Sequence, residues 1–152
     1  MEARLDYYSI APEAAGIMVE FEKYIHSTDL DSTLLELVKT RASQINGCAF
    51  CLDMHTKDAR ANGETEQRLY GLNAWRETDY YTGKERVALA LTEVITEISI
   101  HHVSDELYNE VREQFNEKEF VDLVYAINTI NSWNRLAITM RAVPGEYQPK
   151  ER

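Results

Sequence analysis

Two cysteines and a histidine lie close together in a chain that has no other cysteine. Cys48 and Cys51 are separated by two residues, and His55 follows four positions after Cys51. On a helix, thiols at this spacing share one face and can form a reversible disulfide, and an imidazole one turn further on can take a thiol proton. The same residues could instead bind a metal ion or pack as buried thiols. The spacing therefore predicts a redox centre, a metal site or a structural pair.

Two helices are expected on either side of Gly47, and they would position these side chains. Residues 31–46 carry apolar side chains at helical spacing, with Asp31 placed to cap the start and Gly47 to end the helix. A second helix should run from about Cys48 to a stop before Gly63. Cys48 would then lie against free backbone N–H groups at the positive end of the helix dipole, conditions that lower the pKa of a thiol.

A hairpin of these two helices would add the carboxylate of Glu36 to the group. Glu36 lies ten residues before Asn46, about 15 Å along a helix, and His55 lies eight residues after Gly47, about 12 Å. The hairpin therefore brings Glu36 level with the histidine and the thiols. Considered alone, Glu36 could instead form a capping box with Thr33.

Further helix signals cover most of the remaining chain. A first helix is expected from Pro12 to about Ile25. Three later helix starts are marked by cap residues: the Thr82–Glu85 capping box, Ser104, and Asn116 with an acid three residues on. The last of these opens a helix of about 25 residues by its apolar spacing.

These patterns predict an all-α fold. No internal repeat of about 20 to 50 residues, low-complexity linker or convincing alternating strand interrupts them. At 152 residues, the chain has the length of about one domain. We therefore expect a helical bundle of six to seven helices in a single domain spanning residues 1–152, with its core at about 30–140.

The composition limits the class of protein. Lys and Arg number 16 against 26 Asp and Glu, and the net charge of −10 opposes binding to a polyanion. No apolar run approaches the roughly 20 residues that span a bilayer, and the acidic amino terminus lacks the features of a signal peptide. We therefore expect a cytoplasmic protein that binds neither nucleic acid nor membrane. In that reducing compartment, a close cysteine pair is more often catalytic or metal-binding than structural.

The spacing of Glu36, Cys48, Cys51 and His55, with eleven, two and three intervening residues, resembles the active-site signature of a known family. This family is the alkylhydroperoxidase D-like (AhpD-like) branch of the carboxymuconolactone decarboxylase superfamily. Three segments are similar to the family core and its later helices: ELVKTRASQINGCAFCLDMHTKDAR, LNAWRETDYYTGKERVALALTE and INTINSWNRLAI. The sequence departs at Phe50, because the well-studied peroxidases of the family carry a histidine immediately before the second cysteine.

The resemblance implies an all-helical fold, assembly into trimers or hexamers, and reduction of peroxides by the cysteine pair. Glu36 would hold His55 as a base, directly or through water, and His55 would take the Cys51 proton. The thiolate would attack the peroxide and Cys48 would close the disulfide. The helix terminus favours Cys48 as the attacking thiol and the histidine favours Cys51; the family pattern selects Cys51. An external dithiol protein or small thiol would reduce the pair, and no cofactor or metal is expected.

Other interpretations of the cysteine pair remain open. The chain could be a general disulfide oxidoreductase acting on another substrate, or a non-enzymatic redox-sensing or interaction module. The thiols could bind zinc together with His55 and Glu36, although no second C-x-x-C or H-x₃-H motif completes a tetrahedral site. Decarboxylation of a lactone, as in the superfamily's namesake, is disfavoured because that branch is not expected to depend on such a pair.

The final helix suggests a homo-oligomer. It is apolar over much of its circumference and carries Trp133 with a stripe of Asn128, Asn131 and Asn134. The stripe is either a solvated edge or, as we prefer, part of a subunit interface. Closed cyclic symmetry is the usual result of such contacts, and we expect a hexamer, arranged as a trimer of dimers, in preference to a trimer.

Overall fold

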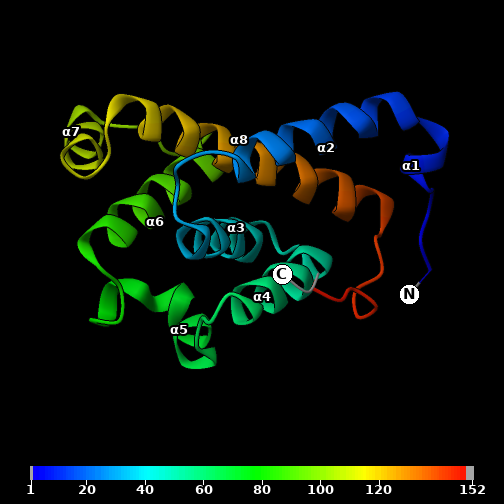
Figure 1. Cartoon of the computed structure of the whole chain (residues 1–152), viewed down its shortest axis with the longest axis horizontal. Helices are drawn as coiled ribbons and strands as arrows, with labels where there is room; N and C mark the ends of the chain where they lie inside the picture. Colours follow the sequence, from blue (N-terminus) through cyan, green and yellow to red (C-terminus); the bar gives the residue numbers. More distant parts are fainter. Residues whose placement is uncertain (1, 150–152) are drawn as a thin grey trace.

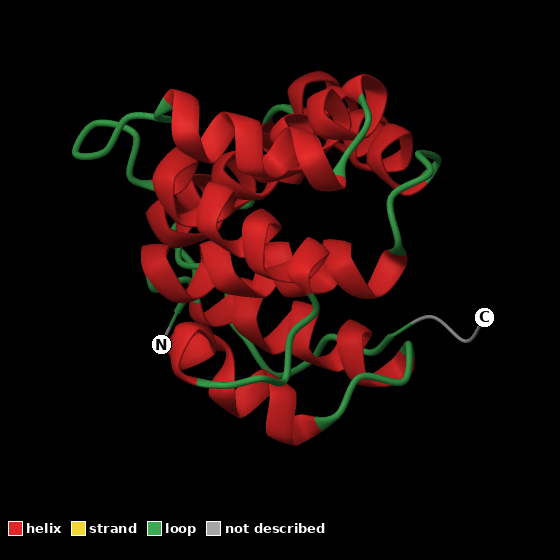
Figure 2. Ribbon diagram, turned by 90° about the vertical axis from the view of Figure 1, so that its left-hand side faces the viewer, coloured by secondary structure: helices red, strands yellow, loops and turns green. Residues whose placement is uncertain are grey.

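The computed structural model describes residues 2–149, and every regular element in that range is helical (Figures 1 and 2). The elements are α1 (Tyr7–Ile10), α2 (Pro12–His26), α3 (Ser32–Asn46), α4 (Ala49–Ala61), α5 (Glu66–Gly71), the 3₁₀ helix η1 (Leu72–Glu77), α6 (Gly83–Thr96), α7 (Asp105–Gln114) and α8 (Glu117–Met140). The all-α prediction is confirmed. None of the helices in the described part is long and apolar enough to cross a membrane.

Two short elements account for the difference between the expected six or seven helices and the eight α-helices found in residues 2–149. Helix α1 has four residues and α5 has six, and a helix this short shows no apolar period in the sequence. Helix α6 also ends at Thr96, before the end of the expected apolar segment. Beyond that point Ile98 and Ile100 are 53% and 70% exposed, so continuing the helix would bury little apolar surface.

The α3–α4 hairpin forms as predicted. The Asp31 carboxylate accepts the Leu34 N–H at 3.0 Å and caps α3. Gly47 ends α3 with a φ of 69°, in the left-handed region that glycine adopts without a steric penalty. Cys48 follows directly as the N-cap residue of α4. The chain therefore reverses within two residues, and the cysteine pair lies at the closed end of the hairpin.

Later helix starts also match the cap residues. Thr82 and Glu85 exchange hydrogen bonds of 2.7 and 3.3 Å at the start of α6, and Asn116 and Glu119 form a second capping box at the start of α8. The Ser104 hydroxyl accepts a backbone N–H in the first turn of α7. Each of these bonds satisfies a donor that a bare helix end would leave unpaired.

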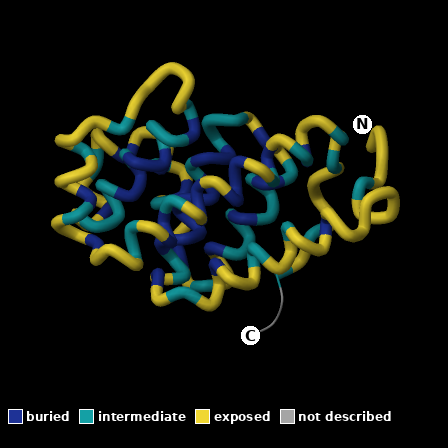
Figure 3. The backbone as a smooth tube through the Cα atoms, turned by 90° about the horizontal axis from the view of Figure 1, so that it is seen from above, coloured by how far each residue is buried: buried dark blue, intermediate teal, exposed yellow. Residues whose placement is uncertain are grey.

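Helix α3 occupies the centre of the bundle. It packs against α4, α6 and α8. Figure 3 shows the buried residues gathered in the interior, with exposed turns around them. The largest apolar cluster joins α3 to α6, α7 and α8, and a second joins it to α5 and η1. A third cluster surrounds the hairpin end and contains Ala42, Cys48, Cys51, Ile130 and Ala137. The cysteine pair is therefore built into the core.

The asparagine stripe of α8 joins helices within the chain. Asn46 donates to the side-chain oxygens of both Asn131 and Asn134 at 2.9 Å. Asn134 is fully buried and donates in turn to the Ser43 hydroxyl. The preferred placement of these amides in a subunit interface is therefore wrong for Asn131 and Asn134, whose polar groups are satisfied inside one protomer. Asn128 is exposed, as the solvated-edge alternative expected.

Residues 143–149, which we call the C-terminal strap, cross α4 after α8 ends (Figure 1). The Gly145 N–H donates to the Asp53 carboxylate at 3.0 Å. The Lys57 ammonium, itself paired with Asp53, donates to the backbone carbonyls of Gly145 and Tyr147. These bonds fix the strap along one side of α4.

Candidate active site

Cys48 and Cys51 form a disulfide at the first turn of α4, with their Cα atoms 5.3 Å apart. Both residues are buried, each 1% exposed. The Cys48 sulfur also accepts the Cys51 N–H at 3.3 Å, so it caps the helix through one of the donors that the helix start leaves free. The pair that the spacing predicted on one helix face is therefore in bonding contact.

Glu36 and His55 form a direct hydrogen bond across the α3–α4 hairpin. His55 Nδ1 lies 2.9 Å from Glu36 Oε2, and the two residues are 5% and 3% exposed. The hairpin brings these residues together as the helical rise predicted. The alternative capping box with Thr33 does not form, because Asp31 caps the helix and Glu36 lies beyond its first turn.

The Glu36 carboxyl is held in its ionised form. Burial alone would raise its pKa, but the hydrogen bond and charge of His55, together with the charges of Lys39 and His26, lower the pKa below its ordinary value. An ionised carboxylate only accepts hydrogen bonds, so Nδ1 of His55 is the atom that donates. The other ring nitrogen, Nε2, is left to take a proton from a neighbouring acid.

A buried lysine supports the same carboxylate from one turn further along α3. Lys39 is 1% exposed and forms an ion pair with Glu22 of α2, and its Nζ lies 3.2 Å from Nε2 of His26. Burial would raise the pKa of Glu22, but the His26 hydrogen bond and the Lys39 charge lower it to about 2. Sequence spacing offered His26 no partner, because these contacts join two helices whose packing no local pattern reveals.

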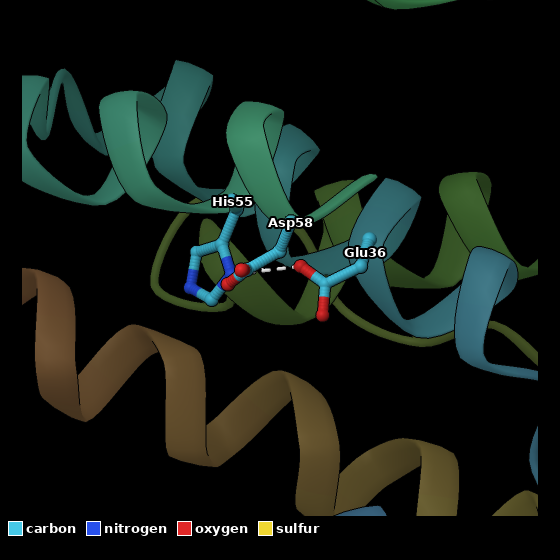
Figure 4. Close-up of side chains that lie close together, drawn as sticks. All are labelled: Glu36, His55 and Asp58. Carbon is cyan, nitrogen blue, oxygen red and sulfur yellow. Dashed lines mark hydrogen bonds and ion pairs between the residues drawn. The ribbon is translucent and has the colours of Figure 1, made fainter. Parts of the chain in front are cut away.

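Two further residues lie beside the Glu36–His55 pair and were missed from the sequence. Asp58 is one turn beyond His55 on α4, and Figure 4 shows its carboxylate converging with the other two side chains. The Tyr147 hydroxyl, carried by the C-terminal strap, donates to Asp58 Oδ1 at 2.7 Å. The spacing of Cys51, His55 and Asp58, four and then three residues, places all three on one helix face and could have indicated Asp58.

A cavity of about 690 Å³ gives access to this group. Its apolar wall consists mainly of Tyr7, Tyr8, Phe50, Met54, Trp133 and Ala137. Its polar lining includes Glu36, Lys39, His55 and Asp58. Cys51 also lines the cavity, whereas Cys48 does not. A small organic molecule in this space would therefore meet Cys51 and His55 together.

Three of these side chains carry atoms that could also bind a metal ion. Within residues 2–149, Glu36, His55 and Asp58 form a group whose potential ligand atoms lie within 4.8 Å of one another. These atoms already bond one another or Tyr147, and the charge of Lys39 acts on the same carboxylate. The cysteines do not join this group, since both sulfurs are in the disulfide. The arrangement suits proton transfer better than cation binding.

Comparisons with known proteins agree on one family. The carboxymuconolactone decarboxylase family model matches residues 12–94. The uncharacterized protein YdfG of Bacillus subtilis (strain 168) is 55% identical over 140 residues, which cover 92% of this chain and 95% of that protein. The match to YdfG therefore extends well beyond the cysteine pair.

Solved structures show the same fold. A protein of unknown function from Agrobacterium tumefaciens, described as a candidate antioxidant defence protein AhpD, is 36% identical with a TM-score of 0.92, covering 96% of this chain and 100% of that one. An uncharacterized peroxidase-related protein from Silicibacter sp. TM1040 is 20% identical with a TM-score of 0.81, and the match covers 91% of this chain and 74% of that one. At this identity the likeness concerns the fold alone. The fold is AhpD-like, and the chain belongs to the carboxymuconolactone decarboxylase family.

Proposed function

We propose that this chain is a thiol-dependent peroxidase in which Cys48 and Cys51 cycle between the dithiol and the disulfide. The observation that carries the proposal is the direct Glu36–His55 hydrogen bond beside a cavity that also reaches Cys51. A buried disulfide alone would serve stability equally well. The oriented imidazole supplies the base that a thiol needs to react near neutral pH.

The reaction starts from the reduced pair. His55 Nε2 takes the Cys51 proton, and the thiolate attacks one peroxide oxygen and breaks the O–O bond. The leaving alkoxide takes the proton from His55 and departs as an alcohol, while Cys51 becomes a sulfenic acid. Cys48 then attacks the Cys51 sulfur, releases water and forms the disulfide. An external dithiol returns two electrons and two protons by thiol–disulfide exchange.

The cavity indicates an organic hydroperoxide as the substrate. A volume of about 690 Å³ lies within the range of small-molecule sites, and its aromatic wall favours an apolar body over hydrogen peroxide. Phe50, at the position of the family's additional histidine, belongs to this wall. It supplies apolar contact and no proton, so the relay consists of Glu36 and His55.

The proposal is tested by anaerobic thiol titration before and after one equivalent of cumene hydroperoxide. We expect two thiols per chain to disappear together and one equivalent of alcohol to form. Retention of both thiols would contradict the proposal. Repeated turnover with added dithiothreitol separates the enzyme from a redox sensor, which would be oxidised once and recover slowly. A general disulfide oxidoreductase would instead exchange readily with disulfide substrates while reacting slowly with peroxide.

A further inference from the structure

Asp58 gives His55 a second carboxylate neighbour. A carboxylate oxygen of Asp58 lies within 4.8 Å of both the His55 ring nitrogen and the Glu36 oxygen (Figure 4). Glu36 reaches the ring from α3, and Asp58 reaches it from the next turn of α4. Two carboxylates near one imidazole place negative charge beside the ring, where a positive charge would form during proton transfer.

The C-terminal strap fixes this second carboxylate. Tyr147 donates its hydroxyl hydrogen to Asp58 Oδ1 at 2.7 Å, and the strap that carries it is bonded to Asp53 and Lys57. Burial and the neighbouring Asp58 carboxylate raise the pKa of Tyr147, so its hydroxyl remains a donor at neutral pH. The bond restricts the Asp58 side chain to the cavity wall, where Tyr147 also lies.

Charged groups from three helices, α2, α3 and α4, lie around the imidazole. Glu36 and Lys39 come from α3, while Glu22 and His26 of α2 lie behind Lys39. Lys39 is paired with Glu22, and its charge also acts on the Glu36 carboxylate. On α4, Asp58 is the acidic residue that joins the Glu36–His55 group.

We propose that Asp58, held by Tyr147, is a positioning residue that stabilises the His55 imidazolium formed when Cys51 loses its proton. The role rests on the proposed function, in which that proton transfer opens the reaction. Asp58 is three residues from His55 and seven from Cys51, about 4.5 and 10.5 Å along the helix axis. Its negative charge therefore stabilises the imidazolium more than it destabilises the thiolate.

The test measures thiolate formation without peroxide. The parent protein is the Cys48→Ser variant, in which Cys51 is the single thiol and serine can still cap α4. The rate of Cys51 alkylation by iodoacetamide is followed against pH in buffer containing a chelator. We expect Asp58→Asn to move the midpoint of this profile upward by about 1 pH unit, the low end of the effect of an opposite charge at 4–6 Å.

Two further variants show whether the charge of Asp58 causes the shift of the alkylation midpoint. Asp53→Asn removes a carboxylate from the same helix and leaves Asp58 beside His55, but it also loosens the strap that carries Tyr147; its midpoint should shift no further than that of Tyr147→Phe. Tyr147→Phe keeps the Asp58 charge and removes its hydrogen bond, so a smaller upward shift is expected. If circular dichroism shows that Asp58→Asn does not fold, the alkylation profile of Tyr147→Phe tests the role of Asp58 instead.

The proposal is overturned if the folded Asp58→Asn profile coincides with the parent, or if Asp53→Asn shifts the midpoint equally. An unshifted Tyr147→Phe profile would overturn it where that variant decides. Alkylation needs no peroxide, so failure of the wild-type protein to consume cumene hydroperoxide would refute the proposed function separately and leave this measurement valid.

Discussion

The imidazole of His55 and the carboxylate of Glu36 are 2.9 Å apart, although 19 positions separate them in the sequence. The bond depends on the reversal at Gly47, which sets α3 and α4 side by side. It also fixes which ring nitrogen faces the carboxylate, because an ionised Glu36 accepts only a donated hydrogen. The base of the proposed reaction is thus oriented before any substrate binds.

Removing either member of this pair should slow the oxidation of the thiols by cumene hydroperoxide. His55→Ala removes the base and should reduce the rate by about 10²–10⁴-fold, the usual contribution of general base catalysis. Glu36→Gln keeps the shape and loses the charge, so about a 10- to 100-fold loss is expected from a charge-assisted hydrogen bond. Stopped-flow measurement of thiol loss checks both values, with circular dichroism to confirm the fold. A wild-type rate in either variant would remove that residue from the mechanism.

Cys51 should be the thiol that peroxide oxidises first. In Cys48→Ser the second step is blocked, so a sulfenic acid should accumulate on Cys51 and react with dimedone. In Cys51→Ser the remaining thiol does not line the cavity, and little adduct should form. Peptide mass spectrometry locates the adduct. Its appearance on Cys48 at the higher yield would reverse the assignment of the two cysteines.

Glu22, bonded to His26 and paired with Lys39, should make stability depend on pH in the acid range. The pKa of Glu22 is lowered from 4.5 to about 2, so its contribution is complete above about pH 4.5 and is lost as the pH falls toward 2. Glu22→Gln should therefore lower the free energy of unfolding by on the order of 3 kcal/mol near neutral pH, and by progressively less on acidification. Urea unfolding at a series of pH values measures the difference.

Glu20→Gln is the matched control for that experiment. Glu20 pairs with Lys23 on the same helix, but both side chains are more than 60% exposed. An exposed pair contributes about 0–1 kcal/mol, so this variant should unfold almost like the wild type at every pH. Equal losses in the two variants would show that burial of Lys39 does not decide the effect.

The protein should assemble into a closed homo-oligomer, with a hexamer preferred over a trimer. On α1 and α2, Ile10 and Ile17 are 64% and 71% exposed, an apolar surface that a partner chain would cover. Sedimentation equilibrium at micromolar concentration should give a mass several times 17.6 kDa. Ile17→Glu should lower that mass, whereas Ile100→Glu, in the segment between α6 and α7 and 70% exposed, should not. A wild-type species of monomer mass would contradict the prediction.

The sequence predicted those features that depend on local bonds. Asp31, Thr82, Ser104 and Asn116 each cap a helix through a backbone group three positions away, so the helix starts could be assigned to the residue. The same applies to Gly47, whose conformation is a property of that one position.

Contacts between distant segments could not be predicted in this way. Tyr147 is 89 positions from Asp58 and lies in a tail with Pro, Gly and charged residues, where no helix cap or apolar spacing indicates a structure. Asn131 was placed on a stripe correctly, but only the packing of α8 on α3 shows that it faces Asn46. A helical period gives the direction of a side chain relative to its helix, and it does not identify the opposite partner.

Both ends of the described chain contribute to the cavity wall, through Tyr7 and Tyr8 near the start and Tyr147 near the end. Chain ends are the parts of a domain that proteases and affinity tags disturb most easily. Trimming them would leave the central helices and the apolar clusters around α3 intact. A preparation could therefore retain full helical content by circular dichroism and a normal melting curve while its substrate site is incomplete. For this protein, intact mass should accompany every measurement of activity.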